Sequence, residues 1–178
     1  YPDVIFLSEA FTRPKVMYRL AKLGFSQSYT YFTWRNTKAE LIEYFEELSH
    51  SEISEFFRPN LWPTTPDILP QYLQFGDERA FAVRLVLAAT LSSNYGIYGP
   101  SFELAINEAP EGREEFLNSE KYEIKHWDWT KGEKLRKMIT VLNNIRQNNP
   151  ALQDFRNTSF YPVDNDYLLF YIKATYDQ

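Results

Sequence analysis

The most constraining feature of the sequence is an alternation of strand-like and helix-like segments, repeated four times over residues 3–147. The strand-like segments are residues 3–8, 25–34, 57–61 and 95–100. Helix-like segments follow them at residues 14–23, 37–48, 78–92 and 131–147. This order favours an α/β fold in which helices connect parallel strands. Four such units are half of an eightfold (β/α)8 barrel. An open flavodoxin-like sheet is the other option, and it is disfavoured because no glycine-rich phosphate-binding turn follows any strand.

Local signals indicate where the helices begin and end. Pro14 stands where the first turn of a helix accepts proline, and Gly24 stands where a helix C-terminus favours glycine. Thr37 and Glu40 have the spacing of a capping box at the start of the second helix. Residues 78–92 form the most apolar helix, so we expect it to be buried on most sides.

The last part of the chain changes character. Residues 158–173 have the pattern of two antiparallel strands about the turn "VDND". We therefore divide the chain into residues 1–149, which form half of a barrel domain, and residues 150–178, which begin a small antiparallel β domain. The segment 101–130 is predicted to be a long loop, and loops of this length inside a compact domain are usually functional.

Composition excludes several classes of protein. The chain has no cysteine and two histidines, which excludes disulfides, thiol chemistry and a histidine-rich metal site, and no cofactor is indicated. The net charge is −5 without a long basic run, which argues against nucleic acid as a partner. The longest apolar run, residues 85–91, is too short to span a membrane. The chain begins with Tyr1 rather than methionine, so we expect a piece cut from a longer protein.

Two carboxylates follow predicted strands. Glu9 ends the first strand and Asp67 follows the third, and functional groups of parallel α/β folds gather at the C-terminal ends of strands. Two carboxylates at one edge suit glycoside chemistry, in which one donates a proton and another stabilises an oxocarbenium-like transition state. The plainer alternatives are a helix cap or an ion pair, and "TTPDIL" around Asp67 also has the form of an N-capping turn.

Other side chains leave two interpretations open. The aromatic residues of the second strand are either core, which is the more common case, or a platform on which sugars stack. They are Tyr29, Tyr31, Phe32 and Trp34. Trp127 and Trp129, in the long loop, are equally compatible with sugar contact and with packing. The charged run "EGREE" at 111–115 is most simply a solvated surface.

Five stretches together resemble a known family. They are "VIFLSEAFTRP", "GFSQSYTYFTWRNT", "FFRPNLWPTTPDILP", "VLAATLSSNYGIYG" and "SEKYEIKHWDW". They are similar to the maltosyltransferases of the α-amylase superfamily, which use maltose 1-phosphate to extend α-1,4-glucans. The resemblance runs through nearly the whole chain. It implies the last four strand–helix units of a (β/α)8 TIM barrel, followed by the first strands of the C-terminal β domain.

The resemblance also implies roles for four residues. Glu9 matches the general acid/base, Asp67 matches the carboxylate that stabilises the transition state, and Lys121 and Tyr122 match positions that contact the maltosyl unit. The family's nucleophilic aspartate lies on the strand before Glu9, outside this chain. We therefore expect the isolated chain to be inactive, and the complete enzyme to be cytoplasmic and to need no metal or cofactor. Its substrates would be maltose 1-phosphate and an α-1,4-glucan acceptor.

Two other functions stay open, and one physical problem follows from the fold. The alternatives are an α-amylase-type hydrolase of α-glucans and a non-catalytic carbohydrate-binding or interaction module. Half of a barrel leaves open strand edges and exposed apolar surface, which promote association. We therefore expect the isolated piece to form a homodimer or otherwise to self-associate.

Overall fold

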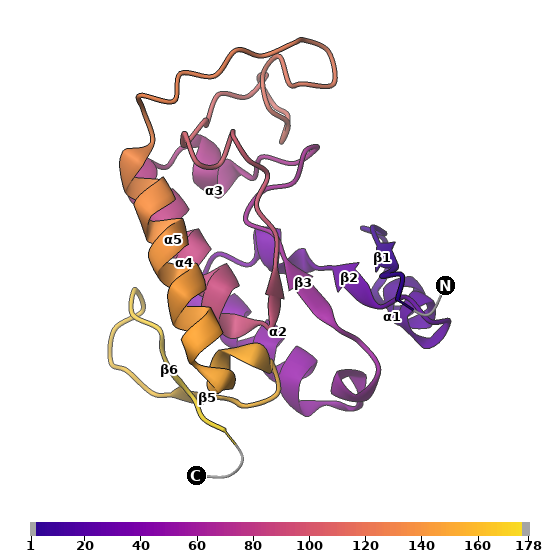
Figure 1. Cartoon of the computed structure of the whole chain (residues 1–178). Helices are drawn as coiled ribbons and strands as arrows, with labels where there is room; N and C mark the ends of the chain where they lie inside the picture. The colour runs from indigo at the N-terminus through magenta and orange to yellow at the C-terminus, as the bar shows by residue number, and fades with distance from the viewer. Residues whose placement is uncertain (1–2, 176–178) are drawn as a thin grey trace.

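The computed structural model describes residues 3–175, and its centre is a four-stranded parallel sheet (Figure 1). The strands lie side by side in chain order and are β1 (Leu7–Ser8), β2 (Gln27–Tyr29), β3 (Pro59–Leu61) and β4 (Asn94–Tyr95). Ser8 lies opposite Ser28, Tyr29 opposite Asn60, and Leu61 opposite Tyr95. The predicted α/β architecture with a parallel sheet is therefore confirmed. The extreme residues of the two predicted domains, 1–2 and 176–178, lie outside the described residues.

Helices connect the strands as the sequence predicts. They are α1 (Pro14–Lys22), α2 (Lys38–His50), α3 (Gln71–Gln74), α4 (Glu78–Leu91) and α5 (Glu133–Asn148). Short 3-10 helices span Tyr31–Trp34, Glu52–Glu55 and Pro150–Gln153. Only the one-turn α3 and the 3-10 helices were not predicted as such, because segments of four residues carry too little periodicity.

The predicted helix ends are confirmed by their geometry. The Thr37 hydroxyl accepts a hydrogen bond from the Glu40 backbone N–H at 3.3 Å, and the Glu40 carboxylate accepts one from the Thr37 N–H at 2.9 Å. Each side chain thereby satisfies an N–H group that the start of α2 would leave unpaired. Gly24 has φ = 107°, a left-handed conformation that favours glycine, and the chain leaves α1 there.

The prediction of a buried strand over residues 3–8 is wrong in extent and in burial. Only Leu7 and Ser8 form β1, and Val4, Ile5 and Phe6 are 48%, 65% and 55% exposed. The sheet covers this segment from one side only, where the backbone of Phe6 bonds with Ser26 and Gln27. Apolar character alone does not bury a strand, because burial also requires a neighbour on each face.

The second strand is also shorter than residues 25–34. It ends at Tyr29, and the chain turns into a 3-10 helix because tertiary partners bind its backbone. The Tyr44 hydroxyl accepts a hydrogen bond from the Tyr31 N–H at 3.0 Å, and the guanidinium of Arg84 donates to the carbonyls of Phe32 and Arg35. These partners are distant in sequence, so local propensity could not predict the end of the strand.

Helix α4 belongs to both halves of the hydrophobic core, which confirms that it is buried on most sides. One half lies among α1, α2 and the sheet and contains Met17, Phe32, Leu41, Tyr44, Phe45, Leu48, Phe57, Leu61, Ala88 and Leu91. The other half lies among α3, α4, α5 and the long loop and contains Leu69, Leu73, Phe81, Leu85, Ala89, Phe102, Phe116, Leu135 and Leu142. Helices α4 and α5 pack side by side in Figure 1.

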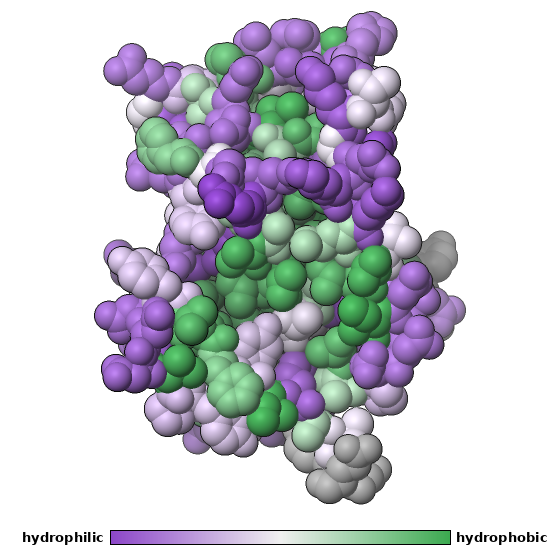
Figure 2. Space-filling view, turned by 90° about the vertical axis from the view of Figure 1, so that its left-hand side faces the viewer, coloured by the Kyte–Doolittle hydropathy of each residue, from purple (hydrophilic) through white to green (hydrophobic). Residues whose placement is uncertain are grey.

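The C-terminal residues form the predicted antiparallel hairpin. Strand β5 (Thr158–Tyr161) pairs with β6 (Phe170–Lys173), and their connection, residues 162–169, is longer than the predicted turn. Lys38 at the start of α2 donates hydrogen bonds to the carbonyls of Val163 and Asn165 at 2.7 and 3.0 Å, which holds the hairpin against the helical layer. Figure 2 views this side of the molecule and shows an apolar area bordered by hydrophilic side chains.

No helix within residues 3–175 is long and apolar enough to cross a membrane.

Candidate active site

The C-terminal ends of the four strands meet at one edge of the sheet, beneath the long loop at the top of Figure 1. Glu9 follows β1, Tyr29 ends β2, Trp62 follows β3 and Gly96 follows β4. Between Tyr95 and Glu133 the described chain contains no helix or strand, as the sequence predicts for residues 101–130. The strand predicted over residues 95–100 is wrong in extent, because β4 ends at Tyr95. The loop reaches the part of this edge near β3, where Glu114 contacts Trp34 and Lys121 contacts Asp67, so side chains distant in the sequence come together there.

Asp67 and Lys121, two of the predicted site residues, form an ion pair. The Asp67 carboxylate raises the pKa of the Lys121 ammonium through a hydrogen bond, so that Lys121 is charged at neutral pH. Both side chains are nearly half exposed. Asp67 stands in a turn closed by hydrogen bonds between Thr65 and Ile68, and its own N–H donates to the Thr65 hydroxyl at 3.2 Å. The turn places this carboxylate at the edge of the sheet where the strands end, and it leaves the carboxylate oxygens accessible to solvent.

Tyr122 and Glu9, the other two predicted site residues, are exposed to solvent. The Tyr122 ring is 77% exposed, and the Lys121 ammonium stands 5.9 Å from its centroid. Glu9 is exposed at the end of β1. Burial raises the pKa of the Tyr29 phenol, and the negative charges of Glu9 and Asp67 raise it further. Both carboxylates are therefore close enough to Tyr29 to act on it electrostatically, although they arise from different strands.

Aromatic rings line the same edge. The rings of Tyr29 and Trp62 are 5.0 Å apart and inclined by 35°, and Phe11 stands 6.0 Å from Tyr29 and 5.3 Å from Trp34. Phe32, by contrast, is completely buried in the core. Phe32 is therefore core and Tyr31 packs against the core, while Tyr29 and Trp34 lie at the edge, where sugar stacking on them stays a prediction.

Gly96 is required by the position of Trp62. A Cβ atom on Gly96 would lie 2.2 Å from Cε2 of the Trp62 ring. We expect Gly96→Ala to lower the free energy of unfolding by about 1–3 kcal/mol, because the ring has to shift. The change in near-ultraviolet circular dichroism and in the urea midpoint would measure this. The same substitution in a Trp62→Leu background should cost much less, and an equal cost in both backgrounds would contradict the steric explanation.

Two glutamates of the long loop were not identified from the sequence. Glu114 accepts hydrogen bonds from the Trp34 indole at 2.7 Å and from the Gln71 N–H at 3.0 Å, so the prediction that "EGREE" is only a solvated surface is wrong for this residue. Glu120 accepts from the Tyr98 hydroxyl at 2.9 Å and from the Trp127 indole at 3.2 Å. The Glu114 contacts anchor the loop to other elements, whereas the Glu120 contacts link parts of the loop to each other. No local pattern reveals the Glu114 contacts, because its partners are distant in sequence.

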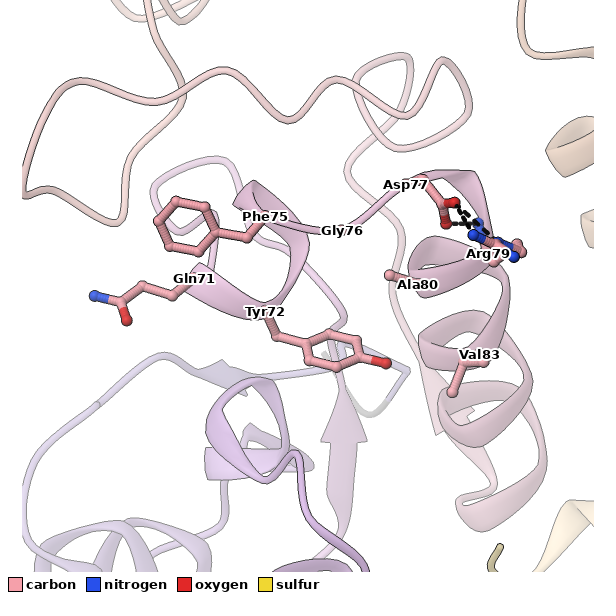
Figure 3. Close-up of a pocket in the computed structure, with 8 residues that line it drawn as sticks. All are labelled: Gln71, Tyr72, Phe75, Gly76, Asp77, Arg79, Ala80 and Val83. Atoms are coloured by element: carbon pink, nitrogen blue, oxygen red, sulfur yellow. Dashed lines mark hydrogen bonds and ion pairs between the residues drawn. The ribbon is translucent and has the colours of Figure 1, made fainter. Parts of the chain in front are cut away.

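A separate pocket with a volume of about 690 Å³ lies on the outside of α3 and the first turns of α4 (Figure 3). Tyr72 and Phe75 flank it on one side, and Asp77 and Arg79 form an ion pair at 2.7 Å on the other. None of the four predicted site residues lines this pocket. Within residues 3–175 there is also no cluster of three or more His, Asp or Glu side chains that could hold a metal ion.

Comparison with known proteins extends the resemblance beyond short motifs. No family model matches the chain. The chain is 58% identical over 174 residues to an alpha-1,4-glucan:maltose-1-phosphate maltosyltransferase of Methylacidiphilum infernorum. The aligned residues are 97% of this chain and 26% of that protein. The counterpart of Chlorobaculum tepidum is 54% identical over 99% of the chain and 27% of its own length. That of Cereibacter sphaeroides is 51% identical over 100% and 30%.

The chain thus spans between a quarter and a third of the length of these curated relatives. The resemblance inferred from the sequence is confirmed: over nearly its whole length, the chain is homologous to a segment of the alpha-1,4-glucan:maltose-1-phosphate maltosyltransferases.

Proposed function

We propose that the chain is part of a longer enzyme that moves maltosyl units from maltose 1-phosphate onto α-1,4-glucans, with retention of configuration. The observation that carries this proposal is the identity of 51–58% to proteins of that name over 97–100% of the chain. The accessible carboxylates at the C-terminal edge of the parallel sheet support it, because this edge carries the active site in parallel α/β barrels.

Each of the two parts of the chain would belong to a different domain of the proposed enzyme. Residues 1–149 would supply the last four strand–helix units of a (β/α)8 barrel, and residues 150–178 would begin its C-terminal β domain. The sequential order β1-β2-β3-β4, with a helical connection after each strand, supports the barrel. The antiparallel hairpin β5–β6 supports the second domain.

In the proposed mechanism Glu9 is the general acid/base. It protonates the phosphate oxygen as the bond between that oxygen and C1 of the maltosyl unit breaks, while an aspartate upstream of this chain forms a bond to C1. Glu9 then removes the proton from the acceptor hydroxyl as that oxygen attacks C1 and releases the aspartate. Asp67 stabilises the positive charge that develops on the sugar in both steps.

Lys121 and Tyr122 would bind the maltosyl unit beside this centre. The ion pair between Lys121 and Asp67 supports their place there, because it brings the loop to the proposed transition-state stabiliser. We further propose that the enzyme is cytoplasmic and needs no metal or cofactor. The isolated chain would self-associate through exposed apolar side chains such as Val4, Ile5 and Phe6.

The decisive experiment supplies the longer protein with maltose 1-phosphate and a short α-1,4-glucan. A transferase lengthens the glucan by two glucose units for each phosphate released, as chromatography of the products would show. An α-amylase-type hydrolase instead releases maltose and shortens glucans, and a binding module changes neither reactant. Either of the last two results would overturn the proposal.

The chain alone should be inactive. The proposed nucleophile lies outside it, and removal of one member of a catalytic unit typically lowers kcat by about 10⁴–10⁶-fold. We expect no maltosyl transfer by residues 1–178 under conditions in which the longer protein turns over fully. Measurable transfer by the isolated chain would contradict the assignment of the nucleophile to an upstream segment.

A further inference from the structure

We propose that Tyr29 is a positioning residue of the candidate active site, whose hydroxyl donates the hydrogen bond that orients the Glu9 carboxylate for proton transfer. The inference rests on the proposed function, since it gives Glu9 its acid/base role. It adds a residue that belongs to neither the catalytic carboxylates nor the proposed sugar contacts.

Tyr29 is placed between the two elements that carry the carboxylates. Strand β2 lies between β1 and β3 in the parallel sheet. Because Ser8 is opposite Ser28, the register brings the residues that come next in the chain, Glu9 after β1 and Tyr29 in β2, to the same level. Asp67 belongs to the turn that follows β3 on the other side of β2. The middle strand therefore delivers one phenol to a position flanked by both carboxylates.

The ring of Tyr29 is held on its faces and edges. Trp62 packs on it at 5.0 Å with an inclination of 35°, and Phe11 contacts it at 6.0 Å. The Trp62 ring also fills the space beside Gly96, where an added Cβ atom would lie 2.2 Å from the ring. A clamped ring leaves the hydroxyl little freedom, and such preorganisation is what orientation of a reacting group requires.

The hydroxyl of Tyr29 is available to donate this hydrogen bond. Within residues 3–175 it makes no hydrogen bond, although the ring is half-buried. Burial, followed by the charges of Glu9 and Asp67, raises the pKa of this phenol, so it keeps its proton at neutral pH. An ionised carboxylate can only accept hydrogen bonds, so a protonated phenol beside it is a complementary partner. Catalytic hydrogen bonds are often long in an unliganded enzyme and tighten when substrate binds.

Tyr29→Phe in the longer protein tests the hydroxyl and keeps the ring. We expect kcat to fall by about 10–100-fold while KM for maltose 1-phosphate stays within about twofold, because the lost interaction orients the acid/base rather than the substrate. The matched control is Tyr18→Phe, which removes a hydroxyl that donates to Glu47 at 2.7 Å between α1 and α2. It should leave both constants unchanged. An unchanged kcat in Tyr29→Phe, or a loss confined to KM, would overturn the inference.

A second measurement does not depend on transferase activity. The longer protein, labelled at the tyrosine ring carbon that bears the hydroxyl, allows Tyr29 to be titrated by NMR and assigned with Tyr29→Phe. Glu9→Gln should lower the pKa of Tyr29 by about half a unit to one unit, because a nearby negative charge is removed. An unchanged titration would overturn the inference whether or not the protein transfers maltose. A shifted titration in a protein that transfers no maltose would sustain the contact and refute the proposed function instead.

Discussion

Glu9→Gln in the longer protein should lower the rate of maltosyl transfer from maltose 1-phosphate by about 10²–10⁴-fold, the usual contribution of a general acid/base. The amide has nearly the shape of the carboxylic acid but cannot supply and recover a proton. Because Glu9 is exposed at the end of β1, the substitution should leave the fold unchanged. The rate of phosphate release with a glucan acceptor measures the effect, and circular dichroism checks the fold.

Two controls make the Glu9 result specific. Glu43→Gln changes an exposed glutamate of α2 and should leave the rate unchanged. A donor whose leaving group needs no proton, such as a maltosyl fluoride, should restore the first half-reaction of Glu9→Gln, since only departure of the phosphate requires the acid. An equal loss with both donors in the rate of the first half-reaction, measured as release of phosphate or fluoride in a single turnover, would contradict the acid role of Glu9.

Arg84→Met should lower the free energy of unfolding by about 2–5 kcal/mol, the range for leaving buried polar groups unpaired. Arg84 is 1% exposed, and its guanidinium donates to the carbonyls of Arg35, at 2.6 Å, and Phe32, over whose ring it lies at 3.8 Å. Methionine fills much of the volume, but it removes the guanidinium donor of the Arg35 carbonyl and one of the two donors of the Phe32 carbonyl, which keeps the Arg35 N–H at 2.9 Å. The shift of the urea midpoint, followed by tryptophan fluorescence, gives the magnitude.

A second arginine of the same helix provides the matched control. Arg79 pairs with Asp77 at 2.7 Å, but its side chain is 91% exposed, so Arg79→Met should leave the urea midpoint almost unchanged. Comparing the urea midpoints of the two variants separates the effect of losing buried hydrogen bonds from the effect of losing an arginine charge. Similar midpoints for the two variants would contradict the structural role assigned to Arg84. Because Arg84 holds the turn after β2, its loss should also disturb Trp34 at the strand edge.

Sequence motifs predicted much of the candidate site, but not how its members are connected. Glu9, Asp67, Lys121 and Tyr122 were identified by resemblance, and their catalytic and binding roles remain predictions. The ion pair between Asp67 and Lys121 was not predicted, and neither was the position of Tyr29 between the two carboxylates. Both result from the approach of separate loops at the strand edge, which a linear pattern does not encode.

What the sequence by itself determined are the features that depend on neighbours in the chain. The caps at Thr37 and Gly24 and the order of strands and helices follow from backbone geometry and hydrophobic periodicity over a few residues. Only the tertiary structure decided which apolar residues are buried, where β2 ends, and that Glu114 binds Trp34 from eighty residues away. Burial and long-range hydrogen bonds depend on which surfaces meet in space, and that is set by the packing of the whole chain rather than by any segment.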